Sequence, residues 1–431
     1  MKGAIGLDFG TTNSTIAIAM SEQDVRVAKF EIDGKFNETF RSVLYFYHPF
    51  DPESGRNQVV AGPEAITKYL ASDPKGRLLQ SLKSFLASRT FTSTSLYRSA
   101  YTLEDLIAVI IRQLKAAVER QFGDAGATVV VGRPVRFSEA KNESDDLFAL
   151  DRLRKAVKAG GFDQIHFEYE PIAAAYSYEQ QLDRQELVLI ADFGGGTSDF
   201  SILRLGPSQK GEKSSRRKIL GTEGVAIGGN DFDSAIVRQL VSPRLGLNSK
   251  YRSHGKLLPT PIGIYKEFER WHYLSFLKNQ KTIKMLESIK ANALEADKIE
   301  NLIHIIEYDL GFQLYRAVER TKLNLSSNES STFVFEGLPA DIICDVTRSQ
   351  FEAWINNYII EIDRTVDRLL LNCHVEMKDI DSVFLTGGSS FVPVVRNIFK
   401  SKFGADRLRS GKELTSIGEG LSLKALELSN Q

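Results

Sequence analysis

Two short motifs in the chain combine aspartate, glycine and threonine in the same order. They are residues 8–12 (DFGTT) and residues 192–197 (DFGGGT). In each, an apolar strand ends in the aspartate and a second apolar strand follows the small residues, which predicts a β-hairpin with an uncrowded turn. Backbone N–H groups can wrap round a phosphate only where side chains do not crowd them. The repeated pattern favours two phosphate sites over two simple turns.

Acidic residues at these turns suggest a magnesium site. Asp8 and Asp192 end strands that we expect to be adjacent, where both carboxylates can face one ion. Mg²⁺ prefers one or two carboxylates, several waters and phosphate oxygens in octahedral array. Asp199, just past the second turn, could order a Mg²⁺-bound water or an attacking water. Glu170, between a strand and a helix, could bond a Mg²⁺ water or simply favour the helix N-terminus.

Two weaker glycine motifs could also contact a nucleotide. One precedes a predicted helix, where backbone N–H groups attract anions; it contains Gly228, Gly229 and Asn230. The other follows a predicted strand and lets a flat group approach the backbone; it contains Gly387, Gly388 and Ser389. Three other phosphate-binding motifs are excluded. Residues 206–214 resemble a P-loop, but Glu212 stands where its Gly-Lys-Ser/Thr ending is required. No GxGxxG dinucleotide motif follows a strand, and the Asp-Phe-Gly triplets lack the catalytic loop of a protein kinase.

The elements that position these residues alternate between strand and helix. After the first hairpin we predict helices over 103–121 and 147–159, strands over 128–131 and 165–169, and a helix opened by Pro171. The second half repeats the scheme, with a strand, a Gly-Gly turn and a helix over 221–240, helices over 262–327, a strand over 381–386 and a last helix over 417–428. Such alternation predicts mixed or parallel sheets covered by helices, in two homologous halves.

Length and charge narrow the class of protein. A chain of 431 residues suits two lobes better than one core. The 55 basic and 55 acidic residues balance, so we expect no nucleic acid and no membrane partner. A basic cluster at 213–218 (KSSRRK) is typical of a solvated loop. The sequence predicts a cytoplasmic protein. It has two cysteines, neither in a metal-binding motif, and we find no signal peptide and no apolar run long enough to span a bilayer.

From Ile5 to about Leu428 the chain resembles the nucleotide-binding domain of Hsp70 chaperones, in the actin/Hsp70/sugar kinase superfamily. It is most similar to the truncated, YegD-like branch. The motifs that carry the resemblance stand in family order: 5–14 (IGLDFGTTNS), 131–135 (VGRPV), 169–176 (YEPIAAAY), 192–203 (DFGGGTSDFSIL), 228–233 (GGNDFD), 319–327 (ERTKLNLSS) and 385–393 (LTGGSSFVP).

The resemblance implies a duplicated actin-like (ribonuclease H-like) ATPase fold of the α/β class, with a cleft for ATP or ADP and Mg²⁺ between two lobes. Lobe I would comprise 1–185, with the C-terminal helix (about 412–431) packing back onto it. Lobe II would comprise 186–411, with a variable helical region at about 262–328 that could bind a protein partner. The linker and peptide-binding domain of full-length Hsp70 proteins are expected to be absent.

By position, the resemblance also assigns roles. Asp8, Asp192 and Asp199 would organise Mg²⁺ and the attacking water, and Glu170 would contact the metal's water shell. The phosphates would bind the two turns, through Gly10, Thr11, Thr12, Asn13, Gly194, Gly195, Gly196 and Thr197. The adenosine would be edged by Glu319, Lys322 and Ser326, with the loop from Gly387 to Ser389 beneath it. An alternative for Glu319 and Lys322 is a helix-face ion pair.

Departures from the family affect the expected activity. Leu323 and Phe391 stand where the family has arginines that contact the adenosine. The family's cleft lysine falls near Ile66, and Lys68 and Lys83 are both candidate substitutes. Without such a lysine, charge stabilisation during phosphoryl transfer would weaken. We therefore expect a slow ATPase or, alternatively, a non-catalytic nucleotide sensor or scaffold; a sugar or carboxylate kinase on the same fold is a third hypothesis.

Overall fold

The computed structural model of the chain describes residues 3–32, 34–51, 56–72, 76–97, 99–124, 128–207, 217–270 and 274–430. Most of the basic cluster predicted at 213–218 lies outside these residues. Within them, no helix combines the length and apolar character that a bilayer crossing requires.

The chain divides into two compact units. Unit 1 comprises Met1–Gly229, Glu361–Ser390 and Val395–Gln431, and unit 2 comprises Asn230–Ile360 and Phe391–Val394. This division differs from the predicted boundary near residue 185, because both large sheets belong to unit 1. The assignment of two lobes therefore stays a prediction.

The first large sheet of unit 1 has the strand order β13-β12-β1-β2-β3, and β6 (Phe40–Arg41) also pairs with β2. The strands β1 (Ala4–Asp8), β2 (Asn13–Ser21) and β3 (Asp24–Val27) form an antiparallel meander. The strands β12 (Thr128–Arg133) and β13 (Gln164–Tyr169) continue the sheet parallel to β1. The predicted first hairpin is confirmed, and its turn falls at one end of the sheet.

The second large sheet repeats this topology. Its order is β16-β15-β14-β21-β22. The strands β14 (Glu186–Phe193), β15 (Ser198–Leu205) and β16 (Lys218–Val225) form the antiparallel meander. The strands β21 (Ser382–Thr386) and β22 (Leu408–Arg409) are parallel to β14. The same arrangement of antiparallel and parallel strands in both sheets confirms the predicted duplication of an α/β fold.

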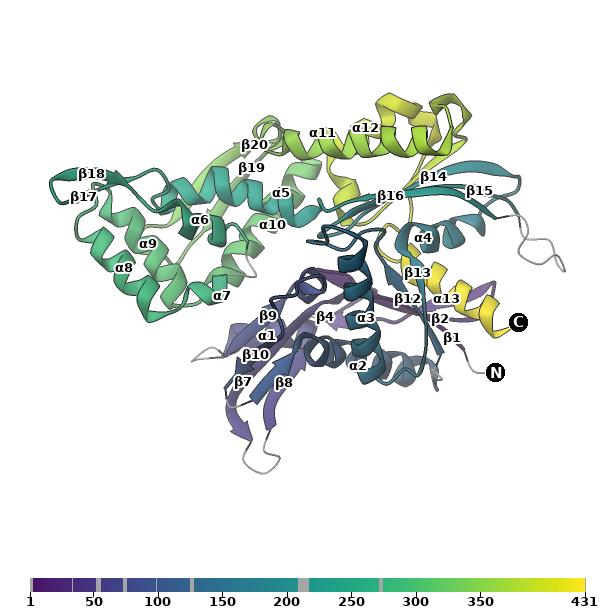
Figure 1. The fold of residues 1–431 in the computed structure, drawn as a ribbon, viewed down its shortest axis with the longest axis horizontal. Helices are drawn as coiled ribbons and strands as arrows, with labels where there is room; N and C mark the ends of the chain where they lie inside the picture. Colours follow the sequence, from purple (N-terminus) through teal and green to yellow (C-terminus); the bar gives the residue numbers. More distant parts are fainter. Residues whose placement is uncertain are drawn as a thin grey trace. The chain divides into compact units, whose positions relative to one another are not determined.

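Two helices form the core of unit 1 beside these sheets. All ten residues of α4 (Glu170–Glu179) are buried. Helix α13 (Ser416–Ser429), near the C-terminus in Figure 1, packs against β1, β2 and α4. The approach is so close that a Cβ on Gly420 would lie 1.7 Å from the carbonyl oxygen of Ala173. A larger residue at this position would force α13 away from α4.

Two further helices of unit 1 lie close to their predicted ranges. Helix α2 (Leu103–Phe122) matches the predicted range closely. Helix α3 (Glu143–Ala159) begins four residues before the predicted start at 147. The cause is the Asn142 side chain, which accepts a hydrogen bond from the backbone N–H of Asp145 at 3.1 Å and caps the helix.

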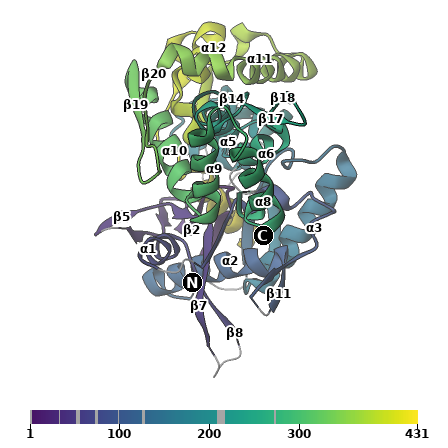
Figure 2. The ribbon, with the colours of Figure 1, turned by 90° about the vertical axis from the view of Figure 1, so that its left-hand side faces the viewer.

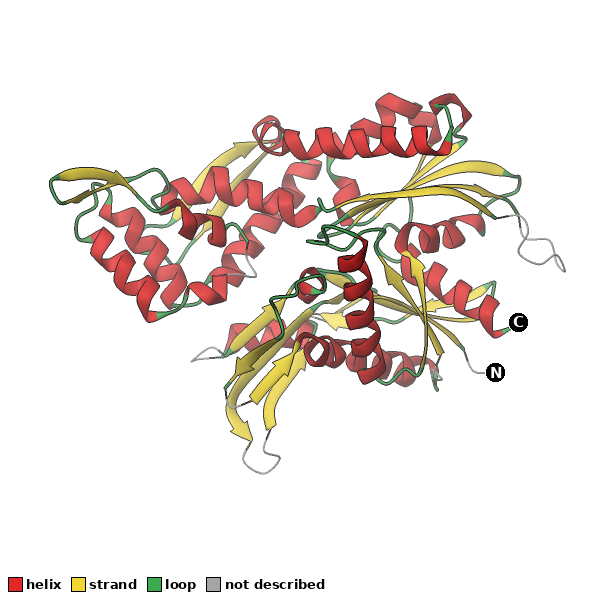
Figure 3. Cartoon of the chain, viewed as in Figure 1, coloured by secondary structure: helices red, strands yellow, loops and turns green. Residues whose placement is uncertain are grey.

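The remaining elements of unit 1 were not predicted as such. Between the first hairpin and α2 the chain forms β4 (Phe30–Ile32), β5 (Lys35–Asn37), β7 (Val43–Asp51), β8 (Arg56–Ala61), α1 (Pro63–Ala71), β9 (Arg77–Gln80), the 3₁₀ turn η1 (Leu82–Phe85), β10 (Ser93–Leu96) and β11 (Ser99–Thr102). Strands β8, β7 and β9 make one antiparallel sheet (Figure 3). Helix α12 (Pro393–Phe403) follows β21 along the chain.

Unit 2 is mainly helical, as predicted for 262–327. Its helices are α6 (Ile262–Phe268), α7 (Leu274–Leu277), α8 (Gln280–Lys290), α9 (Ala296–Glu307) and α10 (Gly311–Ser327). Figure 2 shows α8 beside α9, and the two helices pack together. Two hairpins complete the unit: β17 (Lys250–Ser253) with β18 (Lys256–Pro259), and β19 (Ser330–Phe335) with β20 (Ile342–Thr347). Helices α5 (Gly229–Ile236) and α11 (Arg348–Cys373) each cross the boundary between the units.

Candidate phosphate and metal site

The two predicted phosphate turns lie next to each other in unit 1. A Cβ on Gly196 would stand 3.4 Å from Thr11 Oγ1 and 2.7 Å from Ser138 Oγ. A Cβ on Gly10 would stand only 1.9 Å from the carbonyl oxygen of Asn13. Glycine is therefore required for the tight first turn, and at position 196 it lets the second turn approach the hydroxyls of Thr11 and Ser138 closely.

Hydrogen bonds close each turn on itself. In the first turn, the Gly10 N–H donates to Ser14 Oγ at 3.2 Å, and the Ser42 N–H donates to the carbonyl oxygen of Thr12 at 2.9 Å. In the second, the Gly194 N–H donates to the carbonyl oxygen of Thr197 at 2.9 Å. These bonds hold both turns in shape without a ligand.

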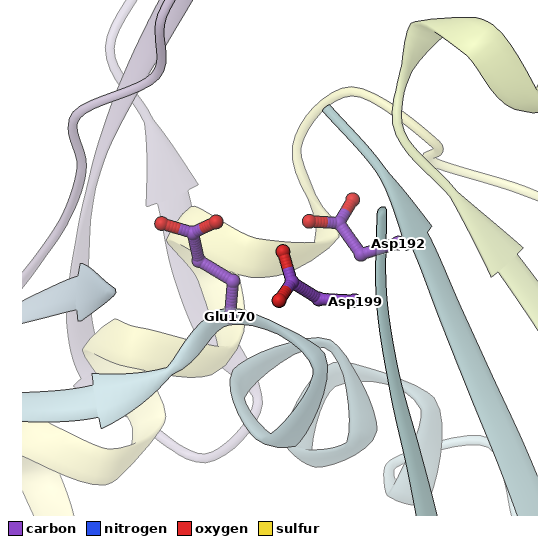
Figure 4. A group of neighbouring side chains, drawn as sticks. All are labelled: Glu170, Asp192 and Asp199. Carbon is purple, nitrogen blue, oxygen red and sulfur yellow. The ribbon is translucent and has the colours of Figure 1, made fainter. Parts of the chain in front are cut away.

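Three carboxyl groups meet beside these turns. One oxygen each from Glu170, Asp192 and Asp199 lies within 4.8 Å of the others, and all three side chains are buried. Figure 4 shows the carboxyl group of Glu170, at the start of α4, beside those of the two aspartates. Asp192 and Asp199 are register partners on β14 and β15, so antiparallel pairing brings them together. Asp8 ends β1, which belongs to the other sheet, so the expectation that its strand is adjacent to the strand of Asp192 is wrong. Asp8 nevertheless interacts electrostatically with both Glu170 and Asp192.

The Asp199 carboxylate is held by two donors. The Val135 N–H donates to Oδ1 at 2.8 Å, and Thr197 Oγ1 donates to Oδ2 at 2.7 Å. A Cβ on Gly224 would lie 2.7 Å from Oδ1, so the glycine makes room for the carboxylate. Asp199 is therefore fixed in orientation, as a residue that orders a water would need to be.

The structure separates the two candidate lysines. Lys83, on the turn η1, is buried and places Nζ 2.6 Å from Glu170 Oε1. Lys68, on α1, contacts Glu64 at 2.9 Å and Tyr47 Oη at 3.2 Å, with 40% of its side chain exposed. Of these two lysines, Lys83 is the one that joins the carboxyl groups.

Burial dominates the electrostatics of the site. It raises the pKa of Asp8 to about 7, with repulsion from Glu170 as the next cause and attraction by Lys83 opposing both. Burial and the charge of Glu170 likewise raise the pKa of Asp199 to about 7. The pKa of Asp192 is raised well above its ordinary range by burial and by Glu170, Asp199 and Asp8. Burial lowers the pKa of Lys83, but Glu170 and Asp8 outweigh it, so that this pKa is raised.

The donor set fits a hard divalent cation. Four acidic side chains share one lysine, and after burial the charges of neighbouring carboxylates are a further cause of the raised pKa values of Asp8, Asp192 and Asp199. Oxygen ligands in this number suit Mg²⁺, which would relieve that repulsion. Asp8 and Asp192 are the predicted Mg²⁺ residues, acting mainly through water.

The motif 228–230 adjoins the second turn through its glycines. The Gly229 N–H donates to the carbonyl oxygen of Gly194 at 3.0 Å. A Cβ on Gly228 would lie 2.6 Å from the carbonyl carbon and oxygen of Gly195. The structure thus brings Gly228 and Gly229 to the phosphate turns, while Asn230 is the second residue of α5 and begins unit 2.

The loop after β21 meets the end of β14. Gly387 has a positive φ of 81°, and its Cβ would lie 2.3 Å from the carbonyl oxygen of Phe193. Its N–H donates to the carbonyl oxygen of Glu413 at 2.7 Å. Only glycine fits this approach. Gly388 and Ser389 follow in the short turn η6 (Gly388–Phe391), where Ser389 is buried.

The other predicted adenosine residues belong to α10 in unit 2. Lys322 Nζ lies 2.7 Å from Oδ1 of the buried Asp233, which resides on α5. Ser326 Oγ donates to the carbonyl oxygen of Lys322 at 3.0 Å. Glu319 lies one turn before Lys322 on the same helix. Leu323 and Phe391 are 61% and 43% exposed. The roles of these residues toward adenosine stay predictions.

Sequence reasoning missed several residues around the site. Ser138 Oγ donates to the carbonyl oxygen of Gly196 at 3.1 Å, and Ser42 Oγ lies 2.8 Å from Ser14 Oγ. The Val135 N–H, which orients Asp199, is a backbone group. Val135 ends the motif 131–135, but a backbone donor has no sequence signature, and a single serine is too common to be one.

Comparisons with known proteins agree with this geometry. A family model described as Hsp70 protein matches residues 81–246 and 299–425. Two curated proteins named chaperone protein DnaK, from Thermosipho africanus and Thermosipho melanesiensis, are each 24% identical over 99% of this chain. The chain spans 59% of the length of these two relatives.

Proposed function

Because the chain belongs to the Hsp70 family, we propose that it binds ATP and ADP with Mg²⁺ and hydrolyses ATP slowly. The observation that supports this most directly is the buried group of Glu170, Asp192 and Asp199, with Lys83 bound to Glu170, beside two glycine turns. Burying several carboxylates together costs free energy unless cations compensate their charge. The group therefore favours a ligand that brings a metal cation with it.

The turns would bind the phosphates. Backbone N–H groups around Gly10 to Asn13 and around Gly194 to Thr197, apart from those of Gly10 and Gly194 that are bonded within the turns, can approach phosphate oxygens because the glycines add no side chains there. Mg²⁺, held mainly through water by Asp8 and Asp192, would neutralise the charge of the β- and γ-phosphates. Gly228 and Gly229 would hold the start of α5 against the second turn, since the Gly229 N–H already donates to the carbonyl oxygen of Gly194.

Asp199 and Lys83 would carry the hydrolysis. Asp199 is held by Val135 and Thr197, so its carboxylate can accept a hydrogen bond from the attacking water and orient that water toward the γ-phosphate. The Lys83 ammonium can stabilise negative charge that develops on the phosphoryl oxygens, while Glu170 keeps the ammonium in place.

The apolar residues at the predicted adenosine site bear on nucleotide affinity. Leu323 and Phe391 supply no cation there, so affinity for the nucleotide should be modest. A non-catalytic nucleotide sensor or scaffold is the alternative on the same residues. The proposed compartment is the cytoplasm, because Cys344 and Cys373 are both free thiols.

Calorimetry of ATP binding with Mg²⁺, followed by single-turnover hydrolysis on the same preparation, tests the proposal. We expect binding, with slow cleavage that is lost in Asp192→Asn. Binding without cleavage would assign the protein to the sensor class. No binding, or undiminished cleavage in Asp192→Asn, would refute the assignment of this site.

A further inference from the structure

The turn that carries Lys83 is too short to fix its own position. Turn η1 has only four residues, and it follows Ser81, whose φ is 54°. Turns of the 3₁₀ type have weak hydrogen-bond geometry and are used in short pieces. The position of Lys83 must therefore depend on what holds this turn from outside.

One buried arginine holds the far end of that turn. Arg152, on α3, is only 4% exposed. Its Nη1 donates to the carbonyl oxygens of Phe85 at 3.3 Å and Ser88 at 3.2 Å. These carbonyls follow Lys83 by two and five residues, and the Leu86 N–H donates to the Lys83 carbonyl oxygen at 3.2 Å. The backbone of Lys83 is thus linked to the guanidinium through consecutive turns.

A carboxylate orients the same guanidinium from the other side. Nε and Nη2 of Arg152 donate to Glu104 Oε1 and Oε2, at 2.7 and 3.3 Å. Glu104 lies in the first turn of α2, so the pairing ties η1, α2 and α3 together. A planar, bidentate fork of this kind has one geometry, unlike the rotating ammonium of lysine.

A second arginine contacts α3 from the segment itself. Arg89 donates from Nε to Asp145 Oδ1 at 3.1 Å and from Nη2 to Ser144 Oγ at 3.0 Å. It is 54% exposed, so its ion pair is worth little compared with the buried one. Arg152 is therefore the stronger anchor.

Burying a charged arginine is costly, and an apolar residue would serve packing alone at least as well. The network is explained if the chain needs a fixed donor where it leaves the turn, because the Phe85 carbonyl oxygen, which also accepts from the Ser88 N–H at 3.0 Å, and the Ser88 carbonyl oxygen are held by one guanidinium. We propose that Arg152 is a positioning residue, which acts through η1 to keep the Lys83 ammonium against Glu170. Its importance for hydrolysis rests on the proposed function, whereas its effect on Lys83 does not.

Amine acylation read by mass spectrometry tests this placement directly. A buried lysine reacts only when its surroundings open, so the acylation rate of Lys83 reports local opening of η1. Arg152→Met removes the hydrogen bonds to both the Phe85 and Ser88 carbonyl oxygens, so we expect it to raise that rate by roughly tenfold or more, tenfold being the scale of a single charge-assisted hydrogen bond. Glu104→Gln, which loosens the guanidinium without removing it, should have a smaller effect in the same direction.

Two controls separate positioning from loss of fold. Lys402, in unit 1, has a side chain only 13% exposed and is paired with Asp363 at 3.1 Å, so its acylation reports general opening. Arg154, two residues along α3, is exposed and donates to the Ile165 carbonyl oxygen, away from η1. Arg154→Met should leave Lys83 protected. Equal increases at Lys83 and Lys402, or an unchanged Lys83, would overturn the proposal.

Kinetics then tell whether the placement matters for the reaction. Single-turnover cleavage of ATP should fall in Arg152→Met while the Kd for ATP stays within about threefold. In a Lys83→Met background, Arg152→Met should have no further effect, because both changes act through one group. If the unaltered protein does not cleave ATP, the proposed function fails, while the acylation result still decides the role of Arg152.

Discussion

Lys83 and Glu170 form a buried ion pair, with Lys83 Nζ 2.6 Å from Glu170 Oε1 and side chains that are 8% and 6% exposed. Glu170 also belongs to the group of three carboxyls. The Glu170 carboxylate therefore faces both the Lys83 ammonium and the proposed metal site. Stability, metal affinity and turnover should all respond to this pair.

Replacing Lys83 should therefore be costly where replacing Lys68 is not. Lys83→Ala leaves buried carboxylates without their cation, so we expect the free energy of unfolding to fall by about 3 kcal/mol. Lys68→Ala removes a surface contact and should cost less than about 1 kcal/mol. Urea unfolding of both variants checks this, and equal midpoints would contradict it. ATP cleavage should be lost only in Lys83→Ala.

Asp199→Asn should separate binding from chemistry. The amide keeps the size of the carboxylate and can still accept from the Val135 N–H, so stability should change by no more than about 1 kcal/mol. Single-turnover cleavage should fall about 100-fold, because the amide orients the attacking water poorly. Calorimetry should show little change in ATP affinity. Asp151→Asn, on the exposed face of α3, is the control, and an equal loss there would argue against a role for Asp199.

Raised carboxyl pKa values predict an unusual dependence of stability on pH. Asp8 and Asp199 have a pKa of about 7 in the fold, against an ordinary value of 3.8. Between these values the folded state binds more protons than the unfolded state, so these groups make stability fall as pH rises from about 4 to about 7. Below and above that window their contribution is constant. Thermal unfolding without metal should show this decline.

Magnesium should reverse that trend. Because Mg²⁺ binds the ionised carboxylates, it should raise the Tm more at pH 8 than at pH 6 and release protons on binding near pH 7. Calorimetry in buffers of different ionisation enthalpy measures the released protons. A Tm increment that is the same at both pH values would show that Mg²⁺ does not bind at these carboxyls.

Gly196→Ala should weaken nucleotide binding more than it weakens the fold. The new methyl would meet Ser138 Oγ at 2.7 Å, a side-chain end that can move, so the stability cost should be about 1 kcal/mol. It would also stand 3.4 Å from Thr11 Oγ1, between the two turns, and we expect ATP affinity to fall roughly tenfold. Adding Ser138→Ala removes the clash but also the hydrogen bond to the Gly196 carbonyl oxygen, so stability should recover only in part and affinity should stay low. Recovery of affinity would contradict a phosphate site between the turns.

Local patterns account for the parts of the fold that were predicted. The two hairpins, α2 and β12 each carry a periodic apolar pattern with turn or cap residues at the ends. The sheet of β7, β8 and β9 was missed, because β9 pairs with β7 across α1 and its run of four residues is too short for an unambiguous apolar pattern. Helix α11, with 26 residues, was also missed, although its sequence carries the signal: the buried residues Ile355, Ile359, Ile362, Val366 and Leu369 stand at helical spacing.

The sequence by itself determined which residue types gather at the site. The repeated turns of aspartate and glycine predicted Asp8, Asp192 and Asp199 as site residues, and the motif around Pro171 predicted Glu170. Tertiary structure alone decided that Lys83 rather than Lys68 joins them, across 87 residues of chain, and that Arg152 holds its turn. The physical reason is that turn chemistry is encoded by neighbours along the chain. Burial and ion pairing between distant segments arise only when the sheets and helices pack.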